Sequence, residues 1–175
     1  MNLLQWVRSI LFSTQATIML PVIGLLYAPW AMVSKRGAYA GCRAYARWVI
    51  WTAKWMINLR CEVRGTVPTI EALVAAKHQS FLDILMIYNA LPASKFIMKS
   101  QQRYAPFPGQ YGTKMQFVFV DRGKRGAAIT KMLADVKAGL RDPGQLVIYP
   151  QGTRSAPGTK MPYKVGTAVL YEQLG

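Results

Sequence analysis

A long uncharged stretch near the amino terminus constrains this chain more than any other feature. No charged residue occurs from position 9 to position 34, and as a helix residues 10–32 would extend roughly 35 Å. The hydrocarbon core of a bilayer is about 30 Å thick, so this stretch is long enough to cross it. It is too long for the apolar part of a signal peptide and has no convincing small-residue cleavage site, so we treat it as mature structure.

Pro21 lies near the middle of this stretch, where it would interrupt a straight helix. The stretch can therefore form a kinked membrane-spanning helix or a re-entrant hairpin, and the alternative is a buried helix of a soluble core. Ordinary buried helices are shorter. The chain is also 52% hydrophobic and only 17% charged, so we expect part of its apolar surface to meet lipid.

The following segment, residues 37–60, combines basic and aromatic side chains. On a helical wheel Arg43, Arg47 and Lys54 fall within about 40° of one another. Three tryptophans flank them: Trp48, Trp51 and Trp55. Basic groups beside indole rings are typical of a helix at a membrane interface. The alternative is a solvated basic face on a helix that packs against the core.

The formal net charge of +15 indicates an anionic partner. Phosphate groups fit this charge, whether they belong to nucleic acid, to a membrane surface or to a small substrate. More positive charge follows the apolar stretch than precedes it. The positive-inside rule therefore predicts that most of the chain lies on the cytoplasmic face of the inner or plasma membrane.

The sequence offers little for metal binding. Cys42 and Cys61 are the two cysteines, and His78 is the single histidine. No second histidine or thiol lies near either cysteine, so neither a zinc site nor a disulfide framework is supported. We expect no bound metal.

Beyond residue 60 short apolar runs alternate with polar segments, which predicts an α/β fold: a mixed, largely parallel sheet flanked by helices. The predicted strands are residues 72–76, 96–98, 117–120 and 146–149. Apolar residues recur at helical spacing between the last two, at Ile129, Met132, Leu133, Val136 and Leu140. We expect a membrane-anchoring helical segment at residues 1–58 and an α/β domain at residues 59–175. Because Gly175 falls inside another helical pattern, we expect that domain to be truncated at its C-terminus.

His78 is followed five residues later by Asp83, in the stretch AAKHQSFLD. Ser80 and Asp83 have the spacing of a capping box at the start of a helix, which by itself would explain the aspartate. On one continuous helix His78 and Asp83 would lie about 140° apart, so they can meet only if the histidine lies in the preceding turn. A histidine held by a carboxylate is a usable general base.

Two arginines follow predicted strands. Arg122 comes after the strand at 117–120, and Arg154 lies in a Gly-Thr-Arg loop after the strand at 146–149. Strand ends open into the usual ligand crevice of α/β sheets, and each guanidinium can bind a phosphate through two donors. Solvated surface arginines are the alternative for each.

Three motifs in this order resemble those of the lysophosphatidic acid acyltransferase family of glycerolipid acyltransferases. N-H-x-S-x-x-D corresponds to KHQSFLD at residues 77–83, G-x-I-F-I-D-R to QFVFVDR at residues 116–122, and F-P-E-G-T-R-S to YPQGTRS at residues 149–155. The resemblance covers about residues 60–175. Lys77, Gln116 and Gln151 depart from the usual Asn, Gly and Glu, and a fourth motif has no counterpart before Gly175.

The resemblance implies a membrane-bound enzyme that moves an acyl group from acyl-CoA or acyl carrier protein to lysophosphatidic acid, giving phosphatidic acid, without a cofactor. His78 would be the base and Asp83 its orienting partner. The acceptor and its phosphate would be bound by Lys99, Arg122, Gln151, Gly152, Thr153 and Arg154. Gln151 cannot carry the negative charge of the family's glutamate, which weakens any charge-pairing role at that position. Anionic membrane lipid is a further expected partner.

Other functions remain open on the sequence. The acceptor could be glycerol 3-phosphate, another lysophospholipid or a lyso-aminolipid, and the chain could be a membrane lipid-binding protein without activity. A serine hydrolase is disfavoured because G-x-S-x-G is absent. A nucleic-acid binder would have no use for the long uncharged stretch, so we expect no nucleic acid.

Overall fold

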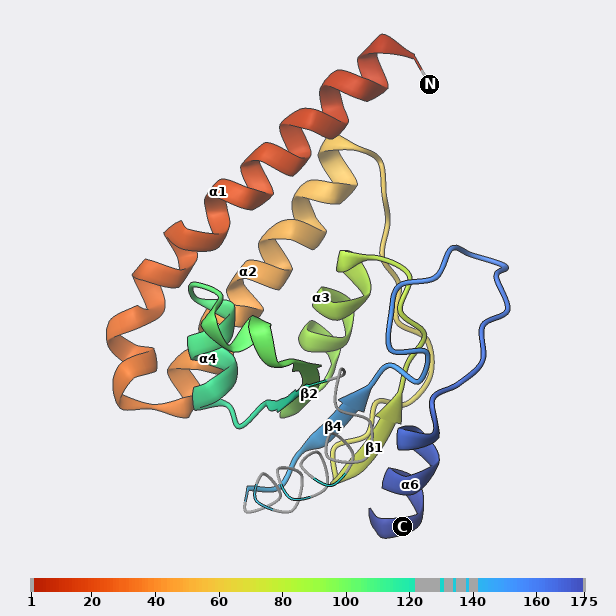
Figure 1. The fold of residues 1–175 in the computed structure, drawn as a ribbon. Coiled ribbons are helices and arrows are strands. Elements are labelled where there is room, and N and C mark those ends of the chain that lie inside the picture. Colours follow the sequence, from red (N-terminus) through yellow and green to blue (C-terminus); the bar gives the residue numbers. More distant parts are fainter. Residues whose placement is uncertain (1, 122–129, 131–133, 135–137, 139–141, 175) are drawn as a thin grey trace.

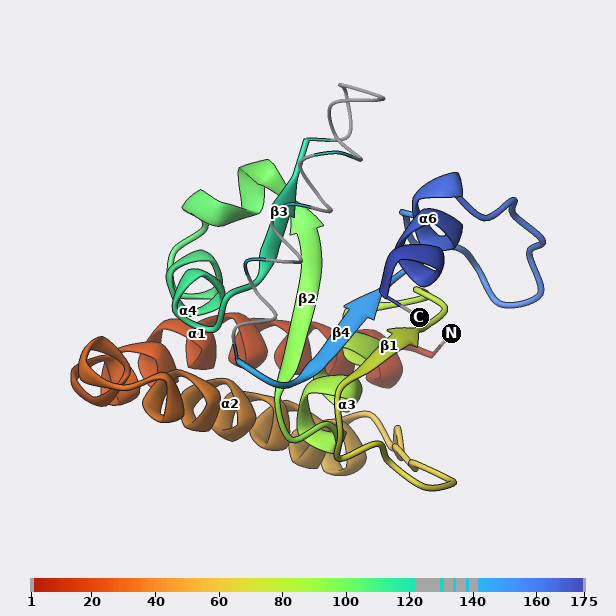
Figure 2. The same ribbon diagram turned by 90° about the horizontal axis from the view of Figure 1, so that it is seen from below.

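The computed structural model describes residues 2–121, 130, 134, 138 and 142–174. Two long helices, α1 (Leu3–Val33) and α2 (Lys35–Met56), lie side by side as a hairpin (Figure 1). The remaining described residues form a four-stranded sheet and shorter helices. Figure 2 shows α3 (Phe81–Ala90) between the hairpin and the sheet.

The chain reverses at Ser34 and not at Pro21. Helix α1 continues through both Pro21 and Pro29, so a re-entrant hairpin within residues 10–32 is not formed, and the hairpin of this structure consists of α1 together with α2. Ser34 has extended backbone angles, and its side chain accepts a hydrogen bond from the Arg36 amide at 3.2 Å, which caps α2. A Cβ atom at Gly37 would lie 2.4 Å from the Trp30 carbonyl carbon, so only glycine fits this close reversal.

Apolar and polar contacts together join the two helices of the hairpin. Ile23 of α1 packs in one cluster with Tyr45, Ala46 and Val49 of α2. The Gln15 amide donates to Thr52 Oγ1 at 3.0 Å and accepts from Trp48 Nε1 at 2.7 Å. The Trp48 side chain therefore bonds to α1, whereas Trp51 and Trp55, the other two tryptophans of the expected interfacial pattern, are exposed.

Some basic side chains of α2 bond to other parts of the protein, and others are exposed. Arg43 donates to the Leu91 carbonyl at 3.1 Å, and Arg47 Nε donates to Asn89 Oδ1 at 3.2 Å, so both bind near the end of α3. Lys54 is exposed and lies over the Trp55 ring. Part of the basic face thus joins the hairpin to the α/β domain and part faces outward.

The sheet confirms the predicted fold class. Its strands are β1 (Ala72–Ala75), β2 (Ser94–Lys99), β3 (Val118–Val120) and β4 (Gln145–Ile148), in the spatial order β1-β4-β2-β3. All three pairings among these described strands are parallel. The residues that predicted a helix between β3 and β4, Ile129, Met132, Leu133, Val136 and Leu140, lie outside the described residues.

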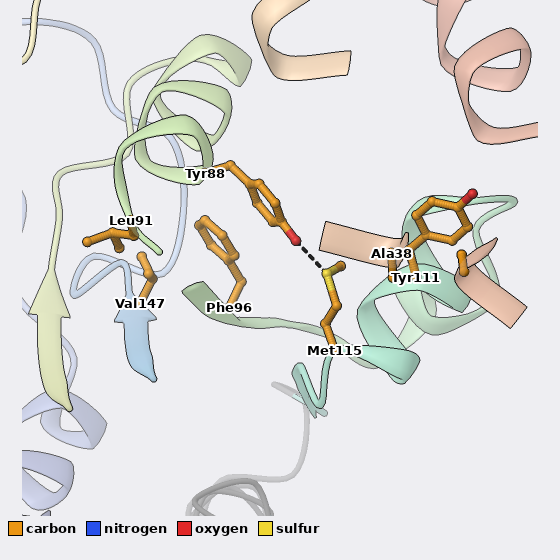
Figure 3. Packing of buried hydrophobic residues seen from close by; sticks show 8 residues of the cluster. Ala38, Tyr88, Leu91, Phe96, Tyr111, Met115 and Val147 are labelled. Atoms are coloured by element: carbon orange, nitrogen blue, oxygen red, sulfur yellow. Dashed lines mark hydrogen bonds between the residues drawn. The ribbon is translucent and has the colours of Figure 1, made fainter. Parts of the chain in front are cut away.

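Both faces of the sheet are covered, as its apolar strands require. Phe96 and Val147 pack with Tyr88 and Leu91 of the α3 region and with Ala38 of α2 (Figure 3). On the opposite face Leu146 and Ile148 pack with Leu170 of α6 (Val165–Leu174). The short helices η1 (Ser100–Tyr104) and α4 (Pro108–Lys114) follow β2, and the Tyr111 hydroxyl donates to the Gly24 carbonyl of α1 at 2.6 Å.

Helix α1 keeps much of its apolar surface in contact with solvent. Among the described helices it alone has the length and hydropathy to cross a membrane, and little of that apolar window is buried. Leu25 and Leu26 are 64% and 72% exposed. These exposed leucines are the side chains that would contact a membrane, and substituting them tests such a contact.

We expect Leu25→Glu with Leu26→Glu to reduce liposome binding at least tenfold without unfolding the protein. Each leucine is already exposed, and placing it in lipid stabilises binding by about 1.5–3 kcal/mol. Flotation with liposomes measures the change. Tyr171→Glu is the control, since Tyr171 is 73% exposed on α6. Equal losses in both proteins would contradict a membrane face on α1.

Candidate active site

His78 lies in the turn after β1, and Asp83 is the third residue of α3. The two side chains meet: His78 Nδ1 lies 2.9 Å from Asp83 Oδ1. The histidine thus lies in the turn before the helix, which is the position that contact with Asp83 requires. Because Nδ1 faces the carboxylate, Nε2 is the ring nitrogen left to accept a proton from another molecule.

The Asp83 carboxylate also caps α3. Its Oδ2 accepts hydrogen bonds from the amides of Gln79 and Ser80, both at 2.7 Å. The Ser80 hydroxyl in turn accepts from the Leu82 amide at 3.1 Å, which completes a capping box. Capping and orientation of the histidine are therefore two uses of one side chain, and the backbone donors fix the carboxylate where His78 needs it.

Tyr149 is a third member of this cluster that the sequence did not identify. It follows β4 directly, its ring stacks on His78 with centroids 4.2 Å apart, and its hydroxyl lies 3.2 Å from Asp83 Oδ1. Burial, and then the nearby Asp83 charge, raises the pKa of the Tyr149 hydroxyl above its usual range, so it is a donor. The parallel pairing of β1 with β4 explains the meeting, because both strands end at the same edge.

The loop after Tyr149 closes over the same turn. The Ser155 amide donates to the His78 carbonyl at 2.9 Å, which ties the loop to the histidine backbone. Gly152 has φ of +70°, a left-handed conformation that favours glycine. Gln151 is only 4% exposed, and its Oε1 accepts from Ser155 Oγ at 3.3 Å, so its side chain supports the loop from inside.

One cavity brings most of the predicted site residues together. His78, Lys99, Gly152, Thr153 and Arg154 all line it. Asp83 lies behind His78 and Gln151 lies within the loop, so neither is among the lining residues. Arg122 lies outside the described residues, and its assignment to a phosphate stays a prediction.

The cavity is large and mostly apolar. Its volume is about 740 Å³, and the helical hairpin contributes to its wall through residues such as Ile23, Gly24 and Cys42. Aromatic rings lead away from the histidine: Tyr149 lies against Phe96, and Phe96 stacks on Tyr88, whose hydroxyl reaches the Met115 sulfur (Figure 3). Such a space suits a long hydrocarbon group whose reactive end lies beside His78.

Cys42 lies on the wall of this cavity, whereas Cys61 lines a separate surface pocket. Cys42 and Cys61 are free thiols, and burial raises the pKa of Cys42 to about 12, which keeps it protonated. Within the described ranges, no cluster of three or more His, Cys, Asp or Glu side chains could hold a metal ion.

The structure combines a parallel α/β sheet with a histidine–aspartate pair whose histidine lines an apolar cavity, an arrangement expected of an enzyme, and sequence comparison identifies the family. Residues 58–175 match the profile of the acyltransferase family, and the chain belongs to it. It is 32% identical over 131 residues to 1-acyl-sn-glycerol-3-phosphate acyltransferase alpha of Mus musculus, covering 73% of this chain and 46% of that protein. It is 31% identical over 121 residues to 1-acyl-sn-glycerol-3-phosphate acyltransferase of Helicobacter pylori, covering 67% and 50%.

The chain thus spans about half the length of these curated relatives. A solved structure extends the likeness to the hairpin. The crystal structure of the 1-acyl-sn-glycerophosphate acyltransferase PlsC from Thermotoga maritima matches with a TM-score of 0.71 at 18% identity, over 96% of this chain and 69% of that one. At that identity the match establishes the shared fold, including an α/β domain joined to amino-terminal helices.

The two uses of Asp83 can be separated by mutation. We expect Ser80→Ala to lower the free energy of unfolding by about 1 kcal/mol, because a cap bond is lost, and to leave His78 in place. Asp83→Asn weakens the cap and also removes the charge that holds the imidazole. Denaturant unfolding measures the first effect and turnover the second. Equal turnover in the two variants would contradict the orienting role.

Proposed function

We propose that this protein is a membrane-bound acyltransferase that moves a fatty acyl group from a thioester to the free hydroxyl of lysophosphatidic acid. The product is phosphatidic acid. The position of the His78–Asp83 pair on a 740 Å³ apolar cavity carries the proposal, because one site then offers a base and a space for the acyl chain. The names of the mouse and Helicobacter pylori relatives support the choice of acceptor.

The proposed reaction needs one base and no acyl-enzyme intermediate. His78 Nε2 takes the proton from the acceptor hydroxyl while that oxygen attacks the thioester carbonyl. Asp83 stabilises the imidazolium that forms. The tetrahedral intermediate then expels the thiolate, which takes the proton from the imidazolium as an ester and a free thiol are released. His78 returns to its neutral form for the next cycle.

Cations at the cavity would hold the acceptor. Arg154 and Lys99 line the same cavity as His78, and the guanidinium of Arg154 can bind a phosphate through two donors. Gly152 and Thr153 would bind through the loop that the Ser155 amide ties to His78, and Gln151 would keep that loop in shape. Arg122 is proposed as a further phosphate ligand because it ends the motif QFVFVDR. Holding both substrates in this geometry would supply much of the rate.

The hairpin gives the proposed enzyme its access to lipid. Exposed leucines of α1 would lie in the cytoplasmic face of the membrane, while α1 and α2 also form a wall of the cavity. A lipid acceptor could then reach His78 without leaving the interface. Anionic lipids fit the net charge of +15, and so do the two possible donors, acyl-CoA and an acidic acyl carrier protein.

A panel assay tests the proposal directly. Detergent-solubilised protein is supplied with labelled acyl-CoA or acyl carrier protein and with lysophosphatidic acid, glycerol 3-phosphate, other lysophospholipids or a lyso-aminolipid. We expect labelled phosphatidic acid as the main product. Transfer to a different acceptor would keep the class and change the substrate, and lipid binding without transfer to any acceptor would contradict the proposal.

His78→Ala should lower turnover by about 10²- to 10⁴-fold, since general-base catalysis typically contributes that much. Lipid binding should change little, because the cavity wall remains. The double variant with Asp83→Asn should be little worse than His78→Ala, since the two side chains act as one unit. Near wild-type turnover in His78→Ala would overturn the mechanism.

Arg154→Ala should raise KM for the phosphorylated acceptor far more than for the thioester. The physical reason is the loss of a charge-assisted contact, which costs about 1.5–3 kcal/mol. Steady-state kinetics with each substrate varied in turn measures both constants. Equal increases in the two constants would remove Arg154 from the phosphate site.

Cys42→Leu should shift donor preference toward shorter acyl chains, because Cys42 lines the cavity beside Tyr88 and leucine adds volume there. A chain-length series of acyl donors measures the shift in kcat/KM. The chain offers a matched control in Cys61→Leu, since Cys61 lines a separate surface pocket with Trp51 and Lys54. An unchanged profile in Cys42→Leu would place the acyl chain elsewhere.

A further inference from the structure

We propose that Tyr149 is a positioning residue of the His78–Asp83 pair and that its hydroxyl limits how strongly Asp83 holds a proton on His78. The catalytic consequence rests on the proposed function. The effect on proton binding at His78 does not, because it depends only on three side chains in contact.

The two oxygens of Asp83 differ in their partners, although His78 Nδ1 lies within reach of both, at 2.9 Å from Oδ1 and 3.2 Å from Oδ2. Oδ2 accepts from the Gln79 and Ser80 amides, both at 2.7 Å, and these backbone donors hold the carboxylate whether or not Tyr149 is present. Oδ1 is shared between His78 Nδ1 at 2.9 Å and the Tyr149 hydroxyl at 3.2 Å. The Tyr149 hydroxyl therefore competes with the histidine for the nearer of its two acceptor oxygens.

Electrostatics gives the sign of the effect. A hydroxyl that donates to Oδ1 directs the positive end of its dipole at the carboxylate. This dipole partly offsets the negative potential that the carboxylate creates at the imidazole. The protonated form of His78 is then less stabilised than it would be beside Asp83 alone. A base must be neutral to accept the acceptor's proton, so the hydroxyl would keep His78 usable at a lower pH.

The Tyr149 ring contributes separately from its hydroxyl. It stacks on the imidazole at 4.2 Å with 23° between the ring planes, and it lies against Phe96 on the sheet, so one face of His78 is covered. Phenylalanine keeps this stacking and loses the hydroxyl alone. The family's third motif carries Phe at this position, so Tyr149→Phe introduces a residue that the site can hold.

Other ionisable groups face the same cavity and stay in place in this variant. The cations are Lys99 and Arg154, while the neighbouring Lys77 bonds to the Thr159 carbonyl instead. The remaining groups on the cavity wall are Cys42, Tyr45, Tyr88 and Tyr111. Burial raises the pKa of each of these four, so they stay neutral in the range where histidine titrates.

The experiment uses the fact that His78 is the single histidine of the chain. Protein labelled with ¹³C at histidine Cε1 is titrated in detergent micelles and followed by NMR, so the imidazole signal needs no assignment. We expect the titration midpoint of Tyr149→Phe to lie about 0.5 pH unit above wild type, a threefold change in proton affinity. Tyr104→Phe is the control, because Tyr104 is exposed, and it should leave the midpoint unchanged.

Asp83→Asn calibrates the signal, since loss of the carboxylate should lower the midpoint. A midpoint in Tyr149→Phe that is unchanged or lower than wild type overturns the inference. Activity provides a second reading: the acidic limb of kcat/KM should move upward in pH by the same amount.

The two readings also separate the inference from the proposed function. A raised midpoint in a protein that transfers no acyl group would leave the role of Tyr149 at His78 intact and contradict the proposed function. Normal acyl transfer with an unchanged titration midpoint would support the proposed function and contradict the role of the Tyr149 hydroxyl.

Discussion

The arrangement of the site depends on the carboxylate of Asp83 at the amino end of α3. Two backbone amides, one imidazole and one phenolic hydroxyl donate to it or face it. A helix start offers free amide donors and a positive potential, so a carboxylate at this position is stabilised and fixed in direction. The strand before His78 and the strand before Tyr149 bring the other two donors to it because they pair in parallel.

The hairpin of α1 and α2 gives this polar cluster an apolar wall. Without it the cavity would lose the wall formed by Ile23, Gly24 and Cys42, and α3 would lose the packing that places its amino end. Helix α1 also exposes leucines to the surroundings. Under the proposed function the hairpin would both contact the membrane and shape the cavity.

Much of the α/β domain could be predicted from local pattern. Strands such as Phe117–Val120 are runs of apolar residues that only a covered sheet can bury, and β3 was found within that run. The capping box at Ser80 and Asp83 also follows from spacing alone. The partners of the hairpin could not be predicted in this way, since Arg43 binds a carbonyl about fifty residues away and Trp48 turns inward to Gln15.

Local sequence pattern predicted an apolar amino-terminal helix or hairpin before a mixed, largely parallel α/β domain, and a histidine before a capped helix that carries an aspartate. These features depend on residues close together in the chain, so their periodicity and hydrogen-bonding chemistry can be recognised without the fold. The folded structure was needed to show that Tyr149 joins the pair, that Gln151 is turned inward, and that the hairpin forms a wall of the cavity. These contacts depend on which strands pair and which helices pack together, because packing joins residues whose separation along the chain carries no signal of their distance in space.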